Sequence, residues 1–263
     1  MKKHIYNKDL ALFPLKEKEV HIWNFDISNI SDENRNLLRE VLLQDELQRA
    51  AKFHFEKDRE RFVSGSGLLR LLIKLYTSIP AKDISFEQNK YRKPDILIKQ
   101  NTHKIYFNMS NSQNFVCIGF IKNEQIGVDI EVIKPIKDYL DVANNFFSEV
   151  EKTQLKTYSE DKAMEAFYTC WTGKEAFIKY LGEGLSHPLK EFDVEIRDLN
   201  VDETYKYNIQ TKSRNEIFFV EAFRLKNELV GAYSLKEEPQ ESIYLIFDET
   251  SYSVNSFIRE QLI

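Results

Sequence analysis

The chain has 263 residues, 42% of them hydrophobic and 13% aromatic, which is enough to bury a sizeable core and excludes disorder throughout. Its net charge of −5 is unevenly divided: residues 1–120 carry 20 Lys and Arg against 15 Asp and Glu, whereas residues 121–263 carry 17 against 27. The first part is therefore suited to an anionic ligand and the second to a cation.

The cysteine content and the hydropathy further limit the class of protein to which this chain can belong. The only two cysteines, Cys117 and Cys170, lie in separate apolar runs, which favours reduced core thiols over a disulfide, a zinc site or a nucleophile. No apolar run reaches the length of a membrane span, and the N-terminal residues lack the apolar core of a signal peptide. We expect a soluble, cytoplasmic protein that does not bind a membrane.

Two helices are predicted after an initial strand at His21–Ile27. Ser31 is a plausible N-cap for a helix that continues to about Phe53, and a second helix is expected from Lys57 to about Thr77. A basic cluster surrounds the junction of the two helices, formed by Arg49, Lys52, Arg59 and Arg61. A solvated surface is the common role of such residues, and an anion site is the alternative.

Strands and polar loops follow from Ile84 onward. Asn108–Ser112 is a polar cluster typical of a turn, and its hydroxyl and amide groups also suit pyrophosphate oxygens. The runs Phe115–Ile121 and Ile126–Val132 are separated by four residues, which predicts a hairpin.

The run Ile126–Val132 also carries two acids. Period-2 geometry places Asp129 and Glu131 on the face opposite the apolar residues. Two carboxylates on one strand face repel each other unless solvent or a cation lies between them. Oxygen ligands of this kind suit Mg²⁺, although an exposed strand face with two acids is the common alternative.

A long helix is predicted from Lys162 to Leu181, ending near Gly182 or Gly184. Lys174 falls inside its apolar stripe, where a lysine must reach solvent or meet an anion. Trp171, Glu175 and Lys179 follow at i, i+4 and i+8 and line one edge of this helix. Taken alone, Glu175 and Lys179 would be an ordinary surface pair.

The second half of the chain is expected to hold two shorter helices and a meander. The helices are predicted at Asp138–Phe147 and Glu149–Tyr158, and residues 192–235 contain four strand candidates spaced as an antiparallel meander. The tail from Lys236 adds a strand candidate at Ile243–Phe247 and a helix-like end.

Five motifs occur in a fixed order along the chain, and together they are far more specific than any one of them. They are YRKP (91–94), FNMSNS (107–112), GVDIE (127–131), FFSEVE (146–151) and WTGKEAFIKYLGEGLSHPL (171–189). In order and approximate spacing they resemble the 4′-phosphopantetheinyl transferases of the surfactin-synthetase type, over roughly Leu37 to Ser234.

The resemblance implies an α+β fold of two similar lobes with antiparallel sheets and the cofactor in the cleft between them. It places an N-terminal lobe at residues 1–122, which is basic and faces the coenzyme A phosphates. A C-terminal lobe with the metal and the catalytic helix follows at 123–236. Residues 237–263 form an extension that matches no part of the family and has no assigned role.

The implied enzyme is a holo-carrier-protein synthase. It transfers 4′-phosphopantetheine from coenzyme A to a serine of an apo acyl or peptidyl carrier protein and releases 3′,5′-ADP, with Mg²⁺ as cofactor. We expect a monomer that binds no nucleic acid. By this resemblance the metal ligands are Asp129, Glu131 and Glu175, and Glu175 and Lys179 are the catalytic residues. Whether Glu175 is base, ligand or both stays open.

The same resemblance implies a set of coenzyme A contacts. Arg49 and Arg61 would hold the 3′-phosphate, and Lys93 would approach the nucleotide. The remaining contacts fall to Ser110, Asn111, Lys174 and Lys179. The chain departs from the family at three positions, since Glu46, Arg92 and Asn111 stand where relatives often carry lysine, glycine and histidine.

Two other classes of function compete with a transferase. A non-catalytic relative that binds coenzyme A or a carrier protein is favoured by the departures at Glu46 and Asn111. A metal-dependent phosphohydrolase acting on nucleotides would need no protein acceptor. The complete set of Asp129, Glu131, Glu175 and Lys179 favours the transferase. Glu165, elsewhere on the same helix, is expected to have no part in the site.

Overall fold

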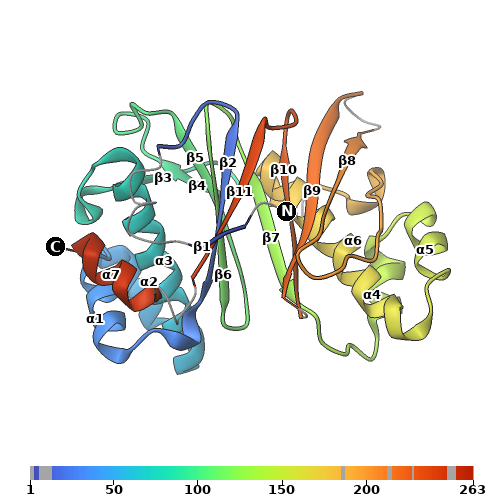
Figure 1. Cartoon of the computed structure of the whole chain (residues 1–263), viewed down its shortest axis with the longest axis horizontal. Coiled ribbons are helices and arrows are strands. Elements are labelled where there is room, and N and C mark those ends of the chain that lie inside the picture. Colours follow the sequence, from blue (N-terminus) through green and yellow to red (C-terminus); the bar gives the residue numbers. More distant parts are fainter. Residues whose placement is uncertain are drawn as a thin grey trace.

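The computed structural model describes residues 3–5, 14–184, 187–211, 215–226, 228–247 and 253–262. Two β-sheets lie face to face between two layers of helices (Figure 1). The first layer contains α1 (Asp32–Glu40), α2 (Gln44–Ala51), α3 (Glu56–Thr77) and α7 (Val254–Leu262). The second contains α4 (Tyr139–Phe146), α5 (Glu149–Leu155) and α6 (Glu160–Leu181). Short 3₁₀ turns lie at Ile27–Asn29, Ala81–Asp83 and Leu189–Glu191.

The first sheet has the order β1-β11-β2-β6-β5. Its strands are β1 (Lys3–Ile5), β2 (Glu19–Asp26), β5 (Ile105–Ser112), β6 (Phe115–Lys122) and β11 (Glu241–Ile246). The pairs that involve β11 are parallel and the others are antiparallel. A separate ribbon of β3 (Phe86–Gln88) and β4 (Pro94–Ile96) lies beside it.

The second sheet is antiparallel throughout, in the order β7-β10-β9-β8. Its strands are β7 (Gly127–Val132), β8 (Thr204–Gln210), β9 (Ile217–Lys226) and β10 (Leu229–Leu235). This confirms the meander expected for three of the four strand candidates between 192 and 235. The fourth, at 192–197, keeps its alternating burial but forms no strand: the Val194 N–H goes to Glu151 instead, and the Ile196 carbonyl accepts from Gln154 and Tyr158.

The fold is therefore α+β with largely antiparallel sheets, as expected. A buried apolar layer joins the two sheets, with Ile22 and Cys117 from the first facing Val128 and Phe223 from the second. Burial of this layer and of the two sheet–helix layers is the main force that holds the lobes together. In the described residues no helix has the length and apolarity to cross a membrane.

The expected hairpin of Phe115–Ile121 with Ile126–Val132 is wrong, because β6 and β7 belong to different sheets. The two strands stack face to face. A Cβ on Gly119 would lie 2.5 Å from a methyl of Val128 and 2.8 Å from one of Ile126, so the missing side chain makes room for this stacking. The chain crosses from one sheet to the other instead of turning back along the same edge.

The single helix expected from Ser31 to Phe53 is also wrong. It is divided into α1 and α2 by a turn at Val41–Leu43. The Leu43 N–H is accepted by the carboxylate of Glu46 at 2.9 Å, so a new helix starts there with its own cap. By contrast, α3 lies where expected, and α6 ends at Gly182, whose φ of 66° is the left-handed conformation that favours glycine.

The tail returns to the first lobe. Strand β11 inserts between β1 and β2, and the side chains of α7 join the core under α1 and α3. The tail also reaches the second lobe, because the Tyr244 hydroxyl donates to the buried carboxylate of Glu221 on β9 at 2.8 Å. The tail is thus part of the first sheet and contacts the second through a side chain.

Candidate active site

At one side of the two stacked sheets, side chains of β5 bond to the backbone of β7. Strand β5 is an edge strand of the first sheet, and β7 is an edge strand of the second. The Asn108 amide oxygen accepts the Val128 N–H at 2.9 Å, and the Ser112 hydroxyl accepts the Val132 N–H at 3.0 Å. Alternate β5 side chains thus occupy the hydrogen-bonding edge of β7, which explains why the cluster Asn108–Ser112 is a strand and not the expected turn.

Asp129 lies at the centre of this junction and is buried. Its Oδ1 accepts a hydrogen bond from the Ser110 hydroxyl at 2.7 Å and another from the Lys179 ammonium at 2.5 Å. Lys179 also donates to the Ser110 oxygen at 3.0 Å. The other oxygen, Oδ2, is buried and has no hydrogen-bond partner within the described residues. A buried carboxylate oxygen in that state is ready for a cation or a donor.

Two further carboxylates lie near Asp129. Glu131 accepts a hydrogen bond from Ser112 at 2.6 Å. Burial raises its pKa, with a smaller contribution from the charge of Asp129. Burial also raises the pKa of Glu175 to about 6, and the charges of Asp129 and Glu131 act in the same direction. The strand pair and the helix edge predicted separately are therefore brought together.

Close approach of α6 to β7 makes this meeting possible. A Cβ on Gly127 would lie 2.0 Å from the Ala176 carbonyl oxygen and 2.2 Å from the Tyr180 nitrogen. Only glycine fits there, so α6 rests directly on the backbone of β7. Glu175 and Lys179, one helical turn apart, are thereby presented to Asp129.

Asp129, Glu131 and Glu175 form the candidate donor set for a metal ion. Within the described ranges, no three carboxylate, imidazole or thiolate side chains are close enough to share one ion. Mg²⁺, however, commonly takes only one or two protein carboxylates and completes its octahedron with phosphate oxygens and water. The open Oδ2 of Asp129, with Glu131 and Glu175 nearby, fits that mode of binding.

A cavity of about 780 Å³ opens in the first lobe, and residues of β5 form part of its lining. Its charged lining is mixed, with Arg49, Arg61, Arg70 and Arg92 beside Asp45, Glu46 and Asp58. Asn111 also lines it, whereas the preceding residue, Ser110, hydrogen-bonds to Asp129. The cavity and Asp129 are therefore in contact with neighbouring residues of β5.

Several lining residues already have partners. The Arg49 guanidinium lies 5.1 Å from the centre of the Phe62 ring, and Arg61 donates to the Gln113 carbonyl at 2.6 Å. Glu46 accepts from the buried Arg70, whose nearest nitrogen is 2.7 Å away. The Glu46 carboxylate is therefore largely neutralised by Arg70, which weakens its repulsion of an anionic ligand.

Comparison with known sequences decides the family. Residues 125–234 match the sequence model of the 4′-phosphopantetheinyl transferase superfamily, and residues 29–121 match that of a 4′-phosphopantetheinyl transferase N-terminal region. The 4′-phosphopantetheinyl transferase HetI of Nostoc sp. is 30% identical over 180 residues, which cover 68% of this chain and 75% of the relative. This chain belongs to the 4′-phosphopantetheinyl transferase family.

Other relatives of the transferase agree. The 4′-phosphopantetheinyl transferase Sfp of Bacillus subtilis is 33% identical over 167 residues, or 64% of this chain and 72% of the relative. The 4′-phosphopantetheinyl transferase gsp of Aneurinibacillus migulanus is 28% identical over 249 residues, which cover 92% of this chain and 95% of the relative. The similarity thus extends over both lobes.

Lys174 of the transferase lies away from the carboxylate group. It is fully buried and forms an ion pair with Glu151 of α5 at 2.8 Å. Its ammonium also donates to the carbonyls of Leu189 at 2.7 Å and Phe192 at 2.9 Å. The lysine of the apolar stripe is therefore paired with a carboxylate inside the protein. Its ammonium is bonded to protein groups and does not face the cavity.

Lys93 of the transferase is likewise engaged with protein. Its ammonium donates to the Ile126 carbonyl at 3.0 Å and to the Tyr180 carbonyl at 3.4 Å. It is absent from the cavity lining, although its neighbours Arg92 and Pro94 belong to it. We therefore keep neither Lys93 nor Lys174 among the residues proposed to contact coenzyme A.

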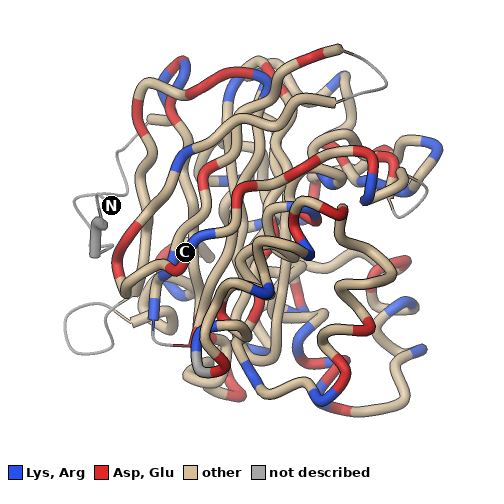
Figure 2. Tube along the Cα trace, turned by 90° about the vertical axis from the view of Figure 1, so that its right-hand side faces the viewer, with Lys and Arg blue, Asp and Glu red and all other residues tan. Residues whose placement is uncertain are grey.

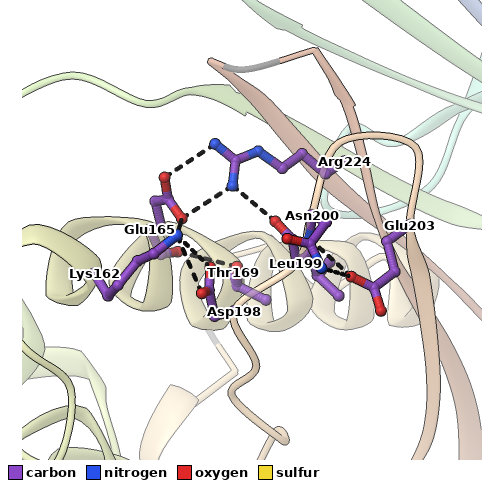
Figure 3. A network of polar contacts seen from close by, with 8 residues as sticks. All are labelled: Lys162, Glu165, Thr169, Asp198, Leu199, Asn200, Glu203 and Arg224. Atoms are coloured by element: carbon purple, nitrogen blue, oxygen red, sulfur yellow. Dashed lines mark hydrogen bonds and ion pairs between the residues drawn. The ribbon is translucent and has the colours of Figure 1, made fainter.

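Glu165 has a structural role that the sequence did not suggest. Figure 3 shows its carboxylate between the guanidinium of Arg224 and the ammonium of Lys162. Both Arg224 contacts are close, at 2.9 and 3.0 Å. Burial alone would raise the pKa of Glu165, but hydrogen bonds with Arg224, Asp198 and Lys162 and the charge of Arg224 together lower it to about 2. The pair ties α6 to β9, so Glu165 is remote from the site but not a silent position.

Sequence reasoning also missed the supporting roles of Asn108 and Ser112 toward β7 and of Glu151 toward Lys174. The capping box Ser148–Glu151 was the available signal for Glu151, because a buried N3 carboxylate can serve a second partner. Viewed from the second lobe, acidic and basic residues are interspersed along the trace (Figure 2).

Proposed function

We propose that this transferase moves the 4′-phosphopantetheine group of coenzyme A to a serine hydroxyl of an apo acyl or peptidyl carrier protein. The observation that carries the proposal is the group formed by Asp129, Glu131, Glu175 and Lys179, together with the cavity that β5 helps to line. Coenzyme A is the donor whose phosphates such an arrangement can hold, with Arg49, Arg61 and Asn111 along the cavity and Ser110 beside Asp129.

In the proposed reaction the serine oxygen forms a bond to the phosphorus on the pantetheine side of the pyrophosphate. The phosphorus–oxygen bond to the nucleotide breaks, and 3′,5′-ADP leaves with the bonding electrons. The serine proton passes to Glu175, directly or through water. With a pKa near 6, this carboxylate is mostly ionised at neutral pH and yet basic enough to accept a proton.

Lys179 is proposed to stabilise the pyrophosphate as a point charge. Its ammonium is partly exposed and already fixed by Asp129 and Ser110. It therefore needs little reorganisation when charge develops on the phosphate oxygens. Mg²⁺, held by Asp129 with Glu131 and Glu175, would supply neutralisation of the same charge.

An exposed apolar surface near the site is a suitable place for the carrier. Leu140, Phe146 and Val150 of α4 and α5 are exposed, and the Phe146 ring packs edge-on against Trp171 at 5.7 Å. Trp171 lies one helical turn from Glu175. A carrier docked on this surface would bring its serine toward that carboxylate. A monomeric, cytoplasmic enzyme that binds no nucleic acid belongs to the same proposal.

One assay tests the proposal against its rivals. The protein is incubated with coenzyme A, Mg²⁺ and an apo carrier protein, and the intact mass of the carrier is measured. A carrier heavier by one phosphopantetheine group supports the transferase. An unmodified carrier with coenzyme A still bound would indicate a binding protein, and nucleotide release without any carrier would indicate a phosphohydrolase.

A further inference from the structure

The ribbon β3–β4 forms part of the cavity wall and also reaches the second lobe. Gln88, Arg92 and Pro94 of this ribbon line the cavity. The turn between the two strands, Asn89–Lys93, lies against the end of α6: the Asn89 side-chain amide donates to the Gly182 carbonyl at 2.9 Å. The wall of the donor cavity is thus in direct contact with the helix that carries Glu175 and Lys179.

Lys93 extends this contact to a second element. Its ammonium bridges the Tyr180 carbonyl, in the last turn of α6, and the Ile126 carbonyl, which immediately precedes β7. The last carbonyls of a helix lack intrahelical partners and form the negative end of its dipole, so an ammonium there is favourable. A single side chain from the first lobe therefore joins the ends of the two elements that bear the carboxylates.

The turn is built to hold this position. The Asn89 side-chain oxygen accepts the N–H groups of Tyr91 at 2.9 Å and Lys93 at 3.0 Å. Arg92 adopts a φ of 69°, a left-handed conformation that closes the turn. On the other side, a Cβ on Gly182 would lie 2.8 Å from the Asn89 amide nitrogen, so the contact requires glycine there. The turn Asn89–Lys93 and the end of α6 therefore pack closely against each other.

We propose that Lys93, together with Asn89, is a positioning residue for phosphopantetheine transfer: it fixes the end of α6 against the start of β7 and links both to the wall of the donor cavity. This inference rests on the proposed function. Burial lowers the pKa of Lys93 to about 8, as expected for an ammonium enclosed by protein. A ligand role for the nucleotide would instead require an ammonium that faces the cavity.

The test compares Lys93→Met with Lys90→Met, an exposed lysine in the same turn. Methionine keeps most of the apolar stem and removes the ammonium. We expect kcat for carrier modification to fall roughly 10- to 100-fold in Lys93→Met, as for a small misplacement of reacting groups. The KM for coenzyme A should stay within about twofold, because uniform binding is not affected. Lys90→Met should match the wild type.

Two measurements that need no turnover accompany the kinetics. Hydrogen exchange should speed up in the last turn of α6 in Lys93→Met, and the calorimetric Kd for coenzyme A should not change. If Lys93→Met fails to fold, Asn89→Ala offers a milder change at the same contact. It should show a smaller increase in the rate of hydrogen exchange and an unchanged Kd for coenzyme A.

A tenfold weaker Kd with unchanged exchange would make Lys93 a nucleotide ligand and overturn the proposal. Unchanged kcat, Kd and exchange would also overturn it. If the wild type modified no carrier, the proposed function would fail by itself, while exchange and Kd would still decide how Lys93 acts.

Discussion

Replacing Lys174 with methionine should destabilise the fold far more than it affects coenzyme A binding. Lys174 and Glu151 are both 0% exposed and lie 2.8 Å apart. Removing one partner of such a pair typically costs about 3–5 kcal/mol, because the other charge is left buried. For a chain of this size we expect Tm to fall by roughly 10 °C.

The contacts around Glu151 set the pH dependence of this loss. After the substitution Glu151 still accepts N–H groups from Val194 at 2.7 Å and from Ser148 at 2.8 Å, but no cation faces it. Burial already raises the pKa of Glu151, and Lys174 lowers it, so the substitution raises it further. A raised carboxyl pKa favours the folded state below that pKa, and this benefit is lost as pH rises through it. The deficit against wild type should therefore shrink in mild acid.

The assay is denaturant unfolding of wild type and Lys174→Met at mildly acidic and mildly alkaline pH, with the Kd for coenzyme A measured below the transition. The control is the double variant Lys174→Met/Glu151→Gln, which removes both charges and should recover most of the stability. Wild-type stability in the single variant, together with weakened coenzyme A binding, would refute the reasoning. It would place the ammonium at the phosphates, as the motif resemblance implies.

Substitutions at four further positions have defined outcomes, and Glu160→Gln serves as the control for the first of them. Glu175→Gln should lower turnover about 10²- to 10⁴-fold without changing the free energy of unfolding. Glu160→Gln, at the exposed start of α6, should leave turnover intact. Equal losses of turnover in the two variants would mean that the helix needs these charges only for folding. Asn111→His should lower the KM for coenzyme A more near pH 6 than near pH 8, and a KM that ignores pH would place this residue away from the phosphates. Gly127→Ala should cost about 3 kcal/mol or more in unfolding free energy, because its Cβ has no space; a well-folded variant would contradict the close helix–strand contact. Arg92→Gly should raise the unfolding free energy by up to about 1 kcal/mol without ligand, and a loss would show that the left-handed φ carries no strain.

The sequence predicted those parts of the site whose residues lie close together along the chain. Strand periodicity placed Asp129 beside Glu131, and helical spacing placed Glu175 beside Lys179. Local patterns cannot tell which edge of a strand is paired, so the crossing from β6 to β7 was taken for a hairpin. The only sign of face-to-face stacking was Gly119, whose meaning depends on a neighbour in the other sheet.

Lysine roles were the least predictable, for a physical reason. A long side chain with a terminal charge can serve a ligand, a carboxylate or a helix end, and local sequence does not distinguish these partners. Lys179 reaches Asp129, Lys174 reaches Glu151 and Lys93 reaches the end of α6. All three occur in the quoted motifs, and only the fold separates them.

The position of β11 has a consequence for synthesis and for handling of the protein. Residues 241–246 form an interior strand between β1 and β2, so the first sheet cannot complete its hydrogen-bonding ladder until this late segment has left the ribosome. Until then the free edge of β2 is open to other extended chains. Truncation of about the last 25 residues removes none of the five motifs, but it would leave that edge permanently open. We expect the truncated protein to aggregate.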